Sequence, residues 1–228
     1  MAAVPTPLRD IEVPMGSHLL VLRAPGRAVV RYPVVFGRGE LVKLHIKLPR
    51  EDKVPPGFVY IPAGRFIFGS TDEAIRKDFA FAAPAHIRTT DEYLISKFKV
   101  TFGEWIEYVS SLPPAERAKK QLRNIVGALG SGDMDLEDLG NNVWKITYKR
   151  EEQVTSAKNT ELLEYPARKF RSKQNWLRFP VGGISRQDAE DYASWMDKTG
   201  RLPGAHLCTE LEWERAARGA AGQRARQV

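Results

Sequence analysis

The stretch FPVGGISRQDAEDYASWMDKTGRLPGAHLCTELEWERAAR, residues 179–218, predicts a short strand followed by two capped helices. Ser185 and Asp188 stand three residues apart where the first helix would begin, and Thr209 and Glu212 repeat this spacing before the second. In such a pair the hydroxyl accepts a backbone N–H of the first turn, and the acidic side chain lies at the positive end of the helix dipole. Both helix starts are therefore predicted from local chemistry.

The first of these helices has an apolar face and a defined end. Gly200 follows the last apolar residue, where a left-handed stop is expected. The apolar positions recur at helical spacing, and they are Ala189, Tyr192, Ala193 and Met196, with Trp195 beside them.

Charged residues crowd the second helix. Glu210, Glu212 and Glu214 lie beside Arg215 and Arg218, an arrangement that could suggest an acid–base pair. Because Glu212 completes a cap and exposed ion pairs are common on helices, we expect capping and surface ion pairing without catalysis.

The aromatic residues of the helical segments are expected to pack in the core. Their spacing and large area favour burial over a ligand platform; they are Trp105, Tyr108, Tyr192, Trp195 and Trp213.

Upstream, two further segments have clear patterns. Residues 93–109, YLISKFKVTFGEWIEYV, predict a strand and then a helix capped by Thr101 and Glu104. Residues 57–70, GFVYIPAGRFIFGS, predict two strands, at 58–61 and 66–68, joined as a hairpin through Pro62, Ala63 and Gly64. Residues 71–81 fit either a helix or a loop.

Three ordered blocks carry a family resemblance. PV-x-x-IS-x-x-DA-x-x-YA-x-W with TE-x-EWE-x-AAR in residues 180–218, the segment 57–70 and the segment 93–109 resemble formylglycine-generating, or sulfatase-modifying-factor, domains. The resemblance covers about residues 58–220 and implies a C-type-lectin-like fold with long loops, of which this chain would hold the N-terminal part. It also implies an oxidase that converts a substrate cysteine with a metal-bound cysteine pair.

The N-terminal residues predict a separate β module. Residues 13–48 contain short apolar runs broken by turns, and in LVKLHIKL, residues 41–48, apolar and polar side chains alternate as in a half-buried strand. The motif LRAPG-x-x-x-x-RYPV resembles PEGA-type β modules. The charged, proline-rich residues 49–57 predict a linker.

The middle of the chain, residues 113–176, looks expanded relative to the family pattern and is expected to lie on the surface as an insertion. Residues 115–126 predict a helix, 127–142 a loop and 144–148 a strand. The loop's acidic residues do not have the spacing of a helix-loop-helix calcium site, so we expect solvated side chains; they are Asp133, Asp135, Glu137 and Asp138.

Composition excludes several classes. The 228 residues carry a net charge of +7, which permits anionic partners but, spread thinly, mostly favours solubility. A single cysteine, Cys208, excludes an internal disulfide. No apolar run approaches the roughly 20 residues of a membrane-spanning helix, and residues 1–14 do not form a signal peptide, so a cytoplasmic location is expected.

The chemistry-bearing residues do not form a recognisable site. One thiolate cannot replace the cysteine pair that a soft metal ion needs, and Cys208 is expected to be a small buried residue before a helix, with a reactive thiol as the alternative. No HxH or HxxxH spacing occurs among the histidines, which are His18, His45, His86 and His206.

A basic segment with aromatic residues, at 169–178, could bind phosphates or a single strand. Glu161 and Glu164 dilute its charge, so a solvated loop edge is expected. The segment contains Lys169, Phe170, Arg171, Lys173, Trp176 and Arg178. Phosphate-loop, nucleophile-elbow and kinase H-R-D motifs are absent from the chain.

The sequence therefore predicts an α+β protein with a small β-sandwich-like module at 13–48, a linker at 49–57 and a partial sulfatase-modifying-factor-type domain at 58–220. Tails are expected at 1–12 and 221–228. We expect no catalytic, cofactor-binding or metal-binding residue.

Two functions stay open from the sequence. The first is a non-catalytic recognition or regulatory module of a larger protein, such as a bacterial serine/threonine kinase, with a protein or peptide partner. The second is a metal-dependent oxidase of the formylglycine-generating or non-haem iron kind, completed by segments outside this chain. Nucleic-acid binding is a third, weaker hypothesis.

Overall fold

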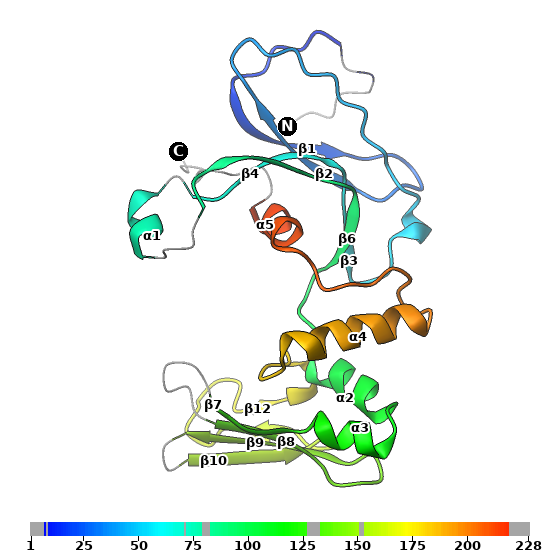
Figure 1. Ribbon diagram of the computed structural model, residues 1–228, viewed down its shortest axis with the longest axis vertical. Coiled ribbons are helices and arrows are strands. Elements are labelled where there is room, and N and C mark those ends of the chain that lie inside the picture. The colour runs from blue at the N-terminus through cyan, green and yellow to red at the C-terminus, as the bar shows by residue number, and fades with distance from the viewer. Residues whose placement is uncertain are drawn as a thin grey trace. The chain divides into compact units, whose positions relative to one another are not determined.

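A computed structural model describes residues 7, 9–70, 72–78, 83–126, 133–150 and 153–218 (Figure 1). The chain combines helices with several small antiparallel sheets, so the predicted α+β class is confirmed. It divides into two compact units. Residues Met1–Lys97 and Cys208–Val228 make the first, and Phe98–Leu207 make the second.

The first unit is built from paired strands and two short helices. Antiparallel pairs join β1 to β2, β3 to β6 and β4 to β5. Its elements are β1 (Gly16–Leu22), β2 (Val30–Phe36), the 3-10 turn η1 (Glu51–Lys53), β3 (Phe58–Ile61), β4 (Gly64–Phe68), α1 (Glu73–Asp78), β5 (His86–Thr90), β6 (Tyr93–Ser96) and α5 (Glu210–Arg218).

The strands β3 to β6 form one bent ribbon, and the predicted hairpin of β3 with β4 is wrong. Ile61 lies opposite Tyr93 and Gly64 lies opposite Thr90, so the register stays the same across the bend. The chain thus turns a corner at Pro62 and continues beside the same partner segment. Figure 1 shows α5 on the concave side of this ribbon.

Residues 41–48 alternate in burial as predicted but form no strand. Val42, Leu44, Ile46 and Leu48 are half-buried while the residues between them are exposed. Three of them pack against the core made by Val30, Tyr32, Val34 and Tyr60. The alternation therefore reflects packing of one side of an extended segment rather than a hydrogen-bonded ladder.

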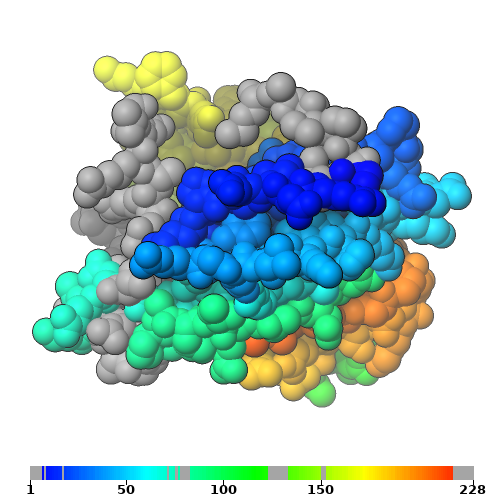
Figure 2. All heavy atoms as spheres, turned by 90° about the horizontal axis from the view of Figure 1, so that it is seen from above, coloured from blue at the N-terminus to red at the C-terminus, as the bar shows by residue number. Residues whose placement is uncertain are grey.

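The N-terminal strands share this unit with the ribbon. Tyr60 of β3 lies in the same buried cluster as Val30 and Val34 of β2. Figure 2 shows β1, in dark blue, running across an outer face, where Leu19 and Val21 are half exposed. The division into modules at residues 49–57 stays a prediction, as do the β-sandwich and C-type-lectin-like descriptions.

The second unit packs helices on a four-stranded antiparallel sheet of order β10-β9-β8-β7. Its elements are α2 (Phe102–Ser110), α3 (Pro114–Lys119), β7 (Leu122–Val126), β8 (Asp133–Asp138), β9 (Trp144–Arg150), β10 (Gln153–Lys158), β11 (Leu163–Glu164), β12 (Lys173–Gln174), the 3-10 turn η3 (Trp176–Arg178) and α4 (Arg186–Lys198).

The core of the second unit contradicts the expected surface insertion. Trp144, Ile146 and Leu136 of the sheet are fully buried and pack with Trp105 of α2 and with Trp176. Residues 113–176 therefore supply one whole side of a hydrophobic core. A segment rich in charge can do this because a sheet needs apolar residues on one face only.

Two local predictions in this region are wrong. The helix expected at 115–126 ends at Lys119, and β7 follows. The acidic residues 133–138 form β8 rather than a loop, with Met134 and Leu136 buried on one face. Of the rest of the predicted loop, residues 139–142 form a bend and turn as predicted, and residues 127–132 lie outside the described residues. The strand predicted at 144–148 is confirmed as β9.

The acidic face of β8 is neutralised by lysines of β9. Asp133 lies opposite Lys149 and Glu137 opposite Lys145, and Lys149 Nζ pairs with Asp135 at 2.9 Å. Oppositely charged cross-strand neighbours stabilise a sheet. These carboxylates therefore have a structural explanation that requires no calcium ion.

Candidate functional site

The three predicted helix caps are confirmed. Thr209 Oγ1 accepts the backbone N–H of Glu212 at 3.3 Å, and the Glu212 carboxylate accepts the N–H of Thr209 at 2.7 Å. The same reciprocal bonds join Ser185 to Asp188 and Thr101 to Glu104. Local sequence therefore sets where α5, α4 and α2 begin.

Arg215 is the most unusual residue of the first unit, because its side chain is fully buried. Its guanidinium donates to the carbonyl oxygens of Pro62 at 2.6 Å and Gly64 at 2.5 Å, and to Thr90 Oγ1 at 2.5 Å. These acceptors lie on both arms of the ribbon where it bends. One arm is β3 with β4, and the other is β5 with β6. The expected surface ion pairing is wrong for Arg215, which joins α5 to the corner.

The Arg215 guanidinium donates to backbone carbonyls and to a hydroxyl, and its Nε has no hydrogen-bond partner among the described residues. Burial lowers the pKa of the Arg215 guanidinium. An arginine remains protonated in proteins even so. Its five donors in a rigid fork suit a corner where several carbonyls converge.

Two more bonds hold α5 against the ribbon. The Glu214 carboxylate accepts the backbone N–H of Gly69 at 2.8 Å, and the Tyr93 hydroxyl donates to the carbonyl of Glu212 at 2.6 Å. Gly69 has a φ of +89°, and a Cβ there would lie 2.5 Å from two backbone oxygens. A glycine is therefore required beside Glu214.

Cys208 lies directly before the cap of α5 and is exposed, so the predicted burial is wrong. The pKa of its thiol is raised by partial desolvation first and by the nearby Glu212 carboxylate second. This is opposite to the lowering that makes a cysteine reactive at a helix start. Desolvation accounts for most of the difference, and the capping glutamate adds to it by placing a negative charge near the sulfur.

The histidines make local contacts. Ring nitrogens of His18, His86 and His206 bond the backbone carbonyls of Pro14, Pro84 and Gly204. His45 lies exposed on the segment after β2. Within the part of the chain that the structure describes, no three potential ligands gather into a metal site.

A polar cluster borders a small cavity of about 220 Å³ in the first unit. Glu92 accepts from the Tyr60 hydroxyl at 2.5 Å and from Lys47 Nζ at 2.6 Å. The hydrogen bond from Lys47, then that from Tyr60, lowers the pKa of Glu92, whereas burial raises the pKa of Tyr60. Lys47 and Tyr60 therefore both bond Glu92, and the bond from Lys47 holds residues 41–48 against the ribbon.

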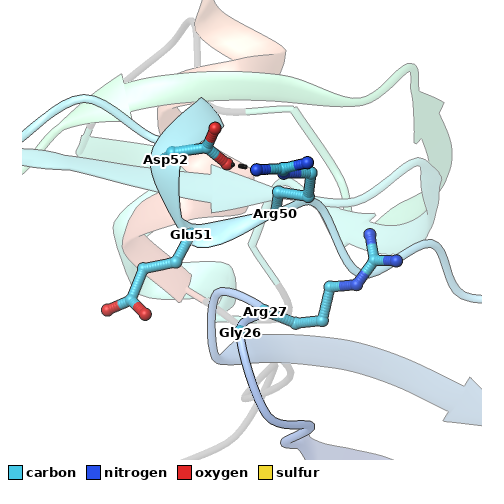
Figure 3. A pocket seen from close by; sticks show the side chains of 5 residues that line it. All are labelled: Gly26, Arg27, Arg50, Glu51 and Asp52. Carbon is cyan, nitrogen blue, oxygen red and sulfur yellow. Dashed lines mark hydrogen bonds and ion pairs between the residues drawn. The ribbon is translucent and has the colours of Figure 1, made fainter.

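A wider hollow of about 700 Å³ lies between the turn at Gly26 and η1 (Figure 3). Arg50 pairs with Asp52 at 2.9 Å, and the side chains of Arg27 and Glu51 point apart. Because the charges do not converge on one point, the hollow lacks the arrangement of a ligand site.

The second unit has an aromatic cluster along α4. Tyr192 packs edge-on and Trp195 packs at a tilt against Tyr108, and Arg201 lies 4.6 Å over the Trp195 ring. Core packing is confirmed for these rings and for Trp105, but it is wrong for Trp213, which is 59% exposed on α5. On α5 the arginine faces inward and the tryptophan outward.

Lys120 is a residue that the sequence did not single out. Its Nζ bonds Asp188 at 2.5 Å and Asp191 at 2.7 Å, joining the end of α3 to α4. Asp188 is also the capping residue of α4, so one carboxylate serves both contacts. Only the acidic spacing on α4 could have suggested a basic partner.

The basic segment at 169–178 is divided by the fold. Trp176 is fully buried in the core, while Phe170 is 87% exposed in the turn between β11 and β12. Lys169, Arg171 and Lys173 lie on the same hairpin as Phe170. Arg178 belongs to η3 instead.

Across the described residues, none of the helices has both the length and the apolar character needed to span a bilayer. The curated proteins compared with this chain include no match. A family model, that of the sulfatase-modifying factor enzyme 1-like domain, matches residues 46–227. This match spans most of the chain: it includes the second unit, the ribbon β3 to β6 and α5 with its buried arginine, but not β1 and β2. The chain therefore belongs to the sulfatase-modifying factor enzyme 1-like family.

Proposed function

We propose that this chain is a non-catalytic member of its family and acts as a recognition or regulatory module. The observation that carries the proposal is the cysteine count: Cys208 is the single cysteine in 228 residues. The resemblance implies oxidation by a metal-bound cysteine pair. Soft metal ions such as Cu(I) select thiolate ligands. One thiolate is a poor substitute where, among the described residues, no three potential ligands gather into a metal site.

The setting of Cys208 supports this proposal. Metal binding requires the thiolate, and the raised pKa of this thiol keeps it protonated at neutral pH. Glu212, whose charge contributes to that shift, is held in place by the cap of α5. A metal-binding role for Cys208 would have to overcome both the proton and the nearby cap.

We infer further that the module belongs to a larger protein and binds a protein or peptide. The resemblance of residues 13–48 to PEGA-type modules supports a neighbouring domain such as a serine/threonine kinase. Reading the DNA on both sides of this coding segment tests the inference. A kinase domain in frame is the expected result, and an unrelated or absent neighbour would contradict the kinase association.

The catalytic test uses the full chain with Cu(I), oxygen and a cysteine-containing peptide, followed by mass spectrometry of the peptide. We expect no conversion of the thiol to an aldehyde, and the same result for Cys208→Ser. Aldehyde formation that Cys208→Ser abolishes would overturn the proposal. Binding of the same peptide, measured by anisotropy, tests recognition separately.

The alternative is a metal-dependent oxidase that obtains its remaining ligands from another polypeptide segment. Family membership and the exposure of Cys208 favour this candidate. It predicts stoichiometric copper or iron in the purified protein, lost in Cys208→Ser. Metal content measured by mass spectrometry of both proteins distinguishes the two functions.

A further inference from the structure

The hairpin formed by β11 and β12 presents a defined loop, residues 165–172. The backbone N–H of Tyr165 donates to Ser172 at 2.6 Å, and that of Arg168 donates to Tyr165 at 3.0 Å. Gln174 Nε2 donates to the carbonyl of Arg171 at 3.1 Å. These bonds close the loop at its base and within its turn, so the exposed side chains have a fixed backbone beneath them.

This hairpin concentrates positive charge. Residues 165–173 contain Arg168, Lys169, Arg171 and Lys173 and no acidic residue, whereas the whole chain has a net charge of +7. Counting Glu164, which pairs with Lys173, residues 164–173 still carry a net charge of +3. Such a concentration is the electrostatic footprint of an anionic partner.

The nearby acidic residues make contacts of their own, and among the described residues these leave three of the four cations without an ion pair. The Glu161 carboxylate accepts the backbone N–H of Lys158 at 2.9 Å, and Glu164 pairs with Lys173 at 2.7 Å. Neither contact involves Arg168, Lys169 or Arg171. Three cations of the loop thus keep their full charge toward solvent.

An exposed aromatic ring lies between two of these cations. Phe170 is 87% exposed and stands in sequence between Lys169 and Arg171, both exposed. Figure 2 shows side chains in the yellow of this segment projecting into open space. The Arg168 guanidinium lies 3.8 Å over the Tyr165 ring, which orders a third cation at the base of the loop.

We propose that the hairpin at 165–173 binds single-stranded nucleic acid. A base stacks on Phe170, and phosphates on either side of that base contact Lys169 and Arg171. Stacking needs only a free ring face, and alternating cations and aromatic residues are the usual means of binding a strand without sequence preference. The proposal does not depend on the function proposed above.

An anionic membrane fits the same surface less well. Membrane anchoring by a loop requires substantial apolar area or a second signal. Here one large apolar side chain lies among four cations, so little apolar area is available for insertion. A flat ring with cations on both sides matches a strand that alternates bases and phosphates more closely.

The test measures binding of the full chain to a fluorescent oligothymidylate of about 12 nucleotides, within the usual range of site sizes. We expect affinity that falls as salt rises. Phe170→Ala should weaken binding about 5- to 100-fold, as loss of one stacked base does. Each of Lys169→Ala and Arg171→Ala should reduce the salt slope by roughly 0.7. Phe170→Trp should retain binding.

Phe98→Ala is the matched control. Phe98 is 78% exposed and also stands between two lysines, Lys97 and Lys99, but its neighbourhood in sequence lacks the further cations of the hairpin. Its substitution should leave binding within about twofold of the unchanged protein, as for a surface site outside the interface.

Three results would overturn the proposal. They are no detectable binding at low salt, equal losses for Phe98→Ala and Phe170→Ala, and competition by polyglutamate as effective as by unlabelled oligonucleotide. Binding to phosphatidylserine vesicles that depends on Phe170, without oligonucleotide binding, would assign the hairpin to a membrane instead.

Discussion

Arg215 in the first unit and Trp144 in the second are both fully buried, but they stabilise their surroundings by different means. Arg215 donates hydrogen bonds to backbone carbonyls at the corner between the β3–β6 pair and the β4–β5 pair. Trp144 fills space between a sheet and α2. The comparison teaches that the corner of the first unit depends on directed hydrogen bonds, whereas the core around Trp144 depends on apolar volume.

The largest effect is expected from Trp144→Ala. Removing a fully buried tryptophan leaves a cavity and costs about 3–5 kcal/mol of unfolding free energy. It also removes the hydrogen bond from its Nε1 to Ser110. Urea denaturation measures the loss. Trp213→Ala, at an exposed tryptophan, is the control and should change stability by no more than about 0.5 kcal/mol; equal effects would contradict the assigned cores.

Arg215→Met is expected to cost about 3 kcal/mol, because the substitution keeps volume but leaves buried acceptors at Pro62, Gly64 and Thr90 without a donor. Hydrogen exchange should rise in β3 to β6 more than in β7 to β10. Arg215→Lys should recover little, since one ammonium group cannot reach carbonyls on both arms in fork geometry. Full stability of the methionine variant would show that the corner needs only apolar filling.

Lys120→Met is expected to cost about 2 kcal/mol at neutral pH, because two carboxylates lose their charged donor. Burial acts to raise the pKa of Asp188, but hydrogen bonds from Lys120 and Ser185 leave it lowered; the hydrogen bond from Lys120 lowers that of Asp191. The stabilisation is therefore complete above the ordinary aspartate value of 3.8 and is lost as pH falls below it.

Denaturation at several pH values between neutrality and the acid range checks this sign. The unchanged protein should lose stability below the ordinary aspartate pKa, and Lys120→Met should lose less over the same range. Parallel profiles for the two proteins would show that Lys120 does not set the charge state of these aspartates.

The smallest effect is expected from the caps, and it should not distinguish the units. Ser185→Ala and Thr209→Ala each remove one hydrogen bond to a first-turn N–H and should cost about 1 kcal/mol. A markedly larger loss for Thr209→Ala would indicate that the start of α5 also positions Arg215. Thermal denaturation of both variants gives the comparison.

Sequence patterns predicted those features that depend only on residues close together in the chain. Caps, helix starts and the strands near Phe58 and Trp144 follow from neighbouring residues and are confirmed. The pairing of β3 with β6 could not be predicted in this way. The partner strand lies more than 30 residues away, and no short turn joins the two strands as it would in a hairpin.

The inward face of α5 was also beyond local reasoning. Hydrophobicity alone places Trp213 inside and Arg215 outside, and the structure has the reverse. The deciding factor is a set of carbonyls on the distant ribbon corner, which need donors that a tryptophan cannot supply in that number. Similarly, the loop predicted for residues 133–138 is wrong because the lysines that neutralise their carboxylates lie on β9.

The unbroken register of the bent ribbon limits where the chain can change length. A single residue added to either arm would turn all later side chains of that arm to the opposite face. Gly64 would then no longer stand opposite Thr90, and Arg215 would meet acceptors from one arm only. Insertions and deletions in related chains are therefore expected outside residues 58–68 and 86–96.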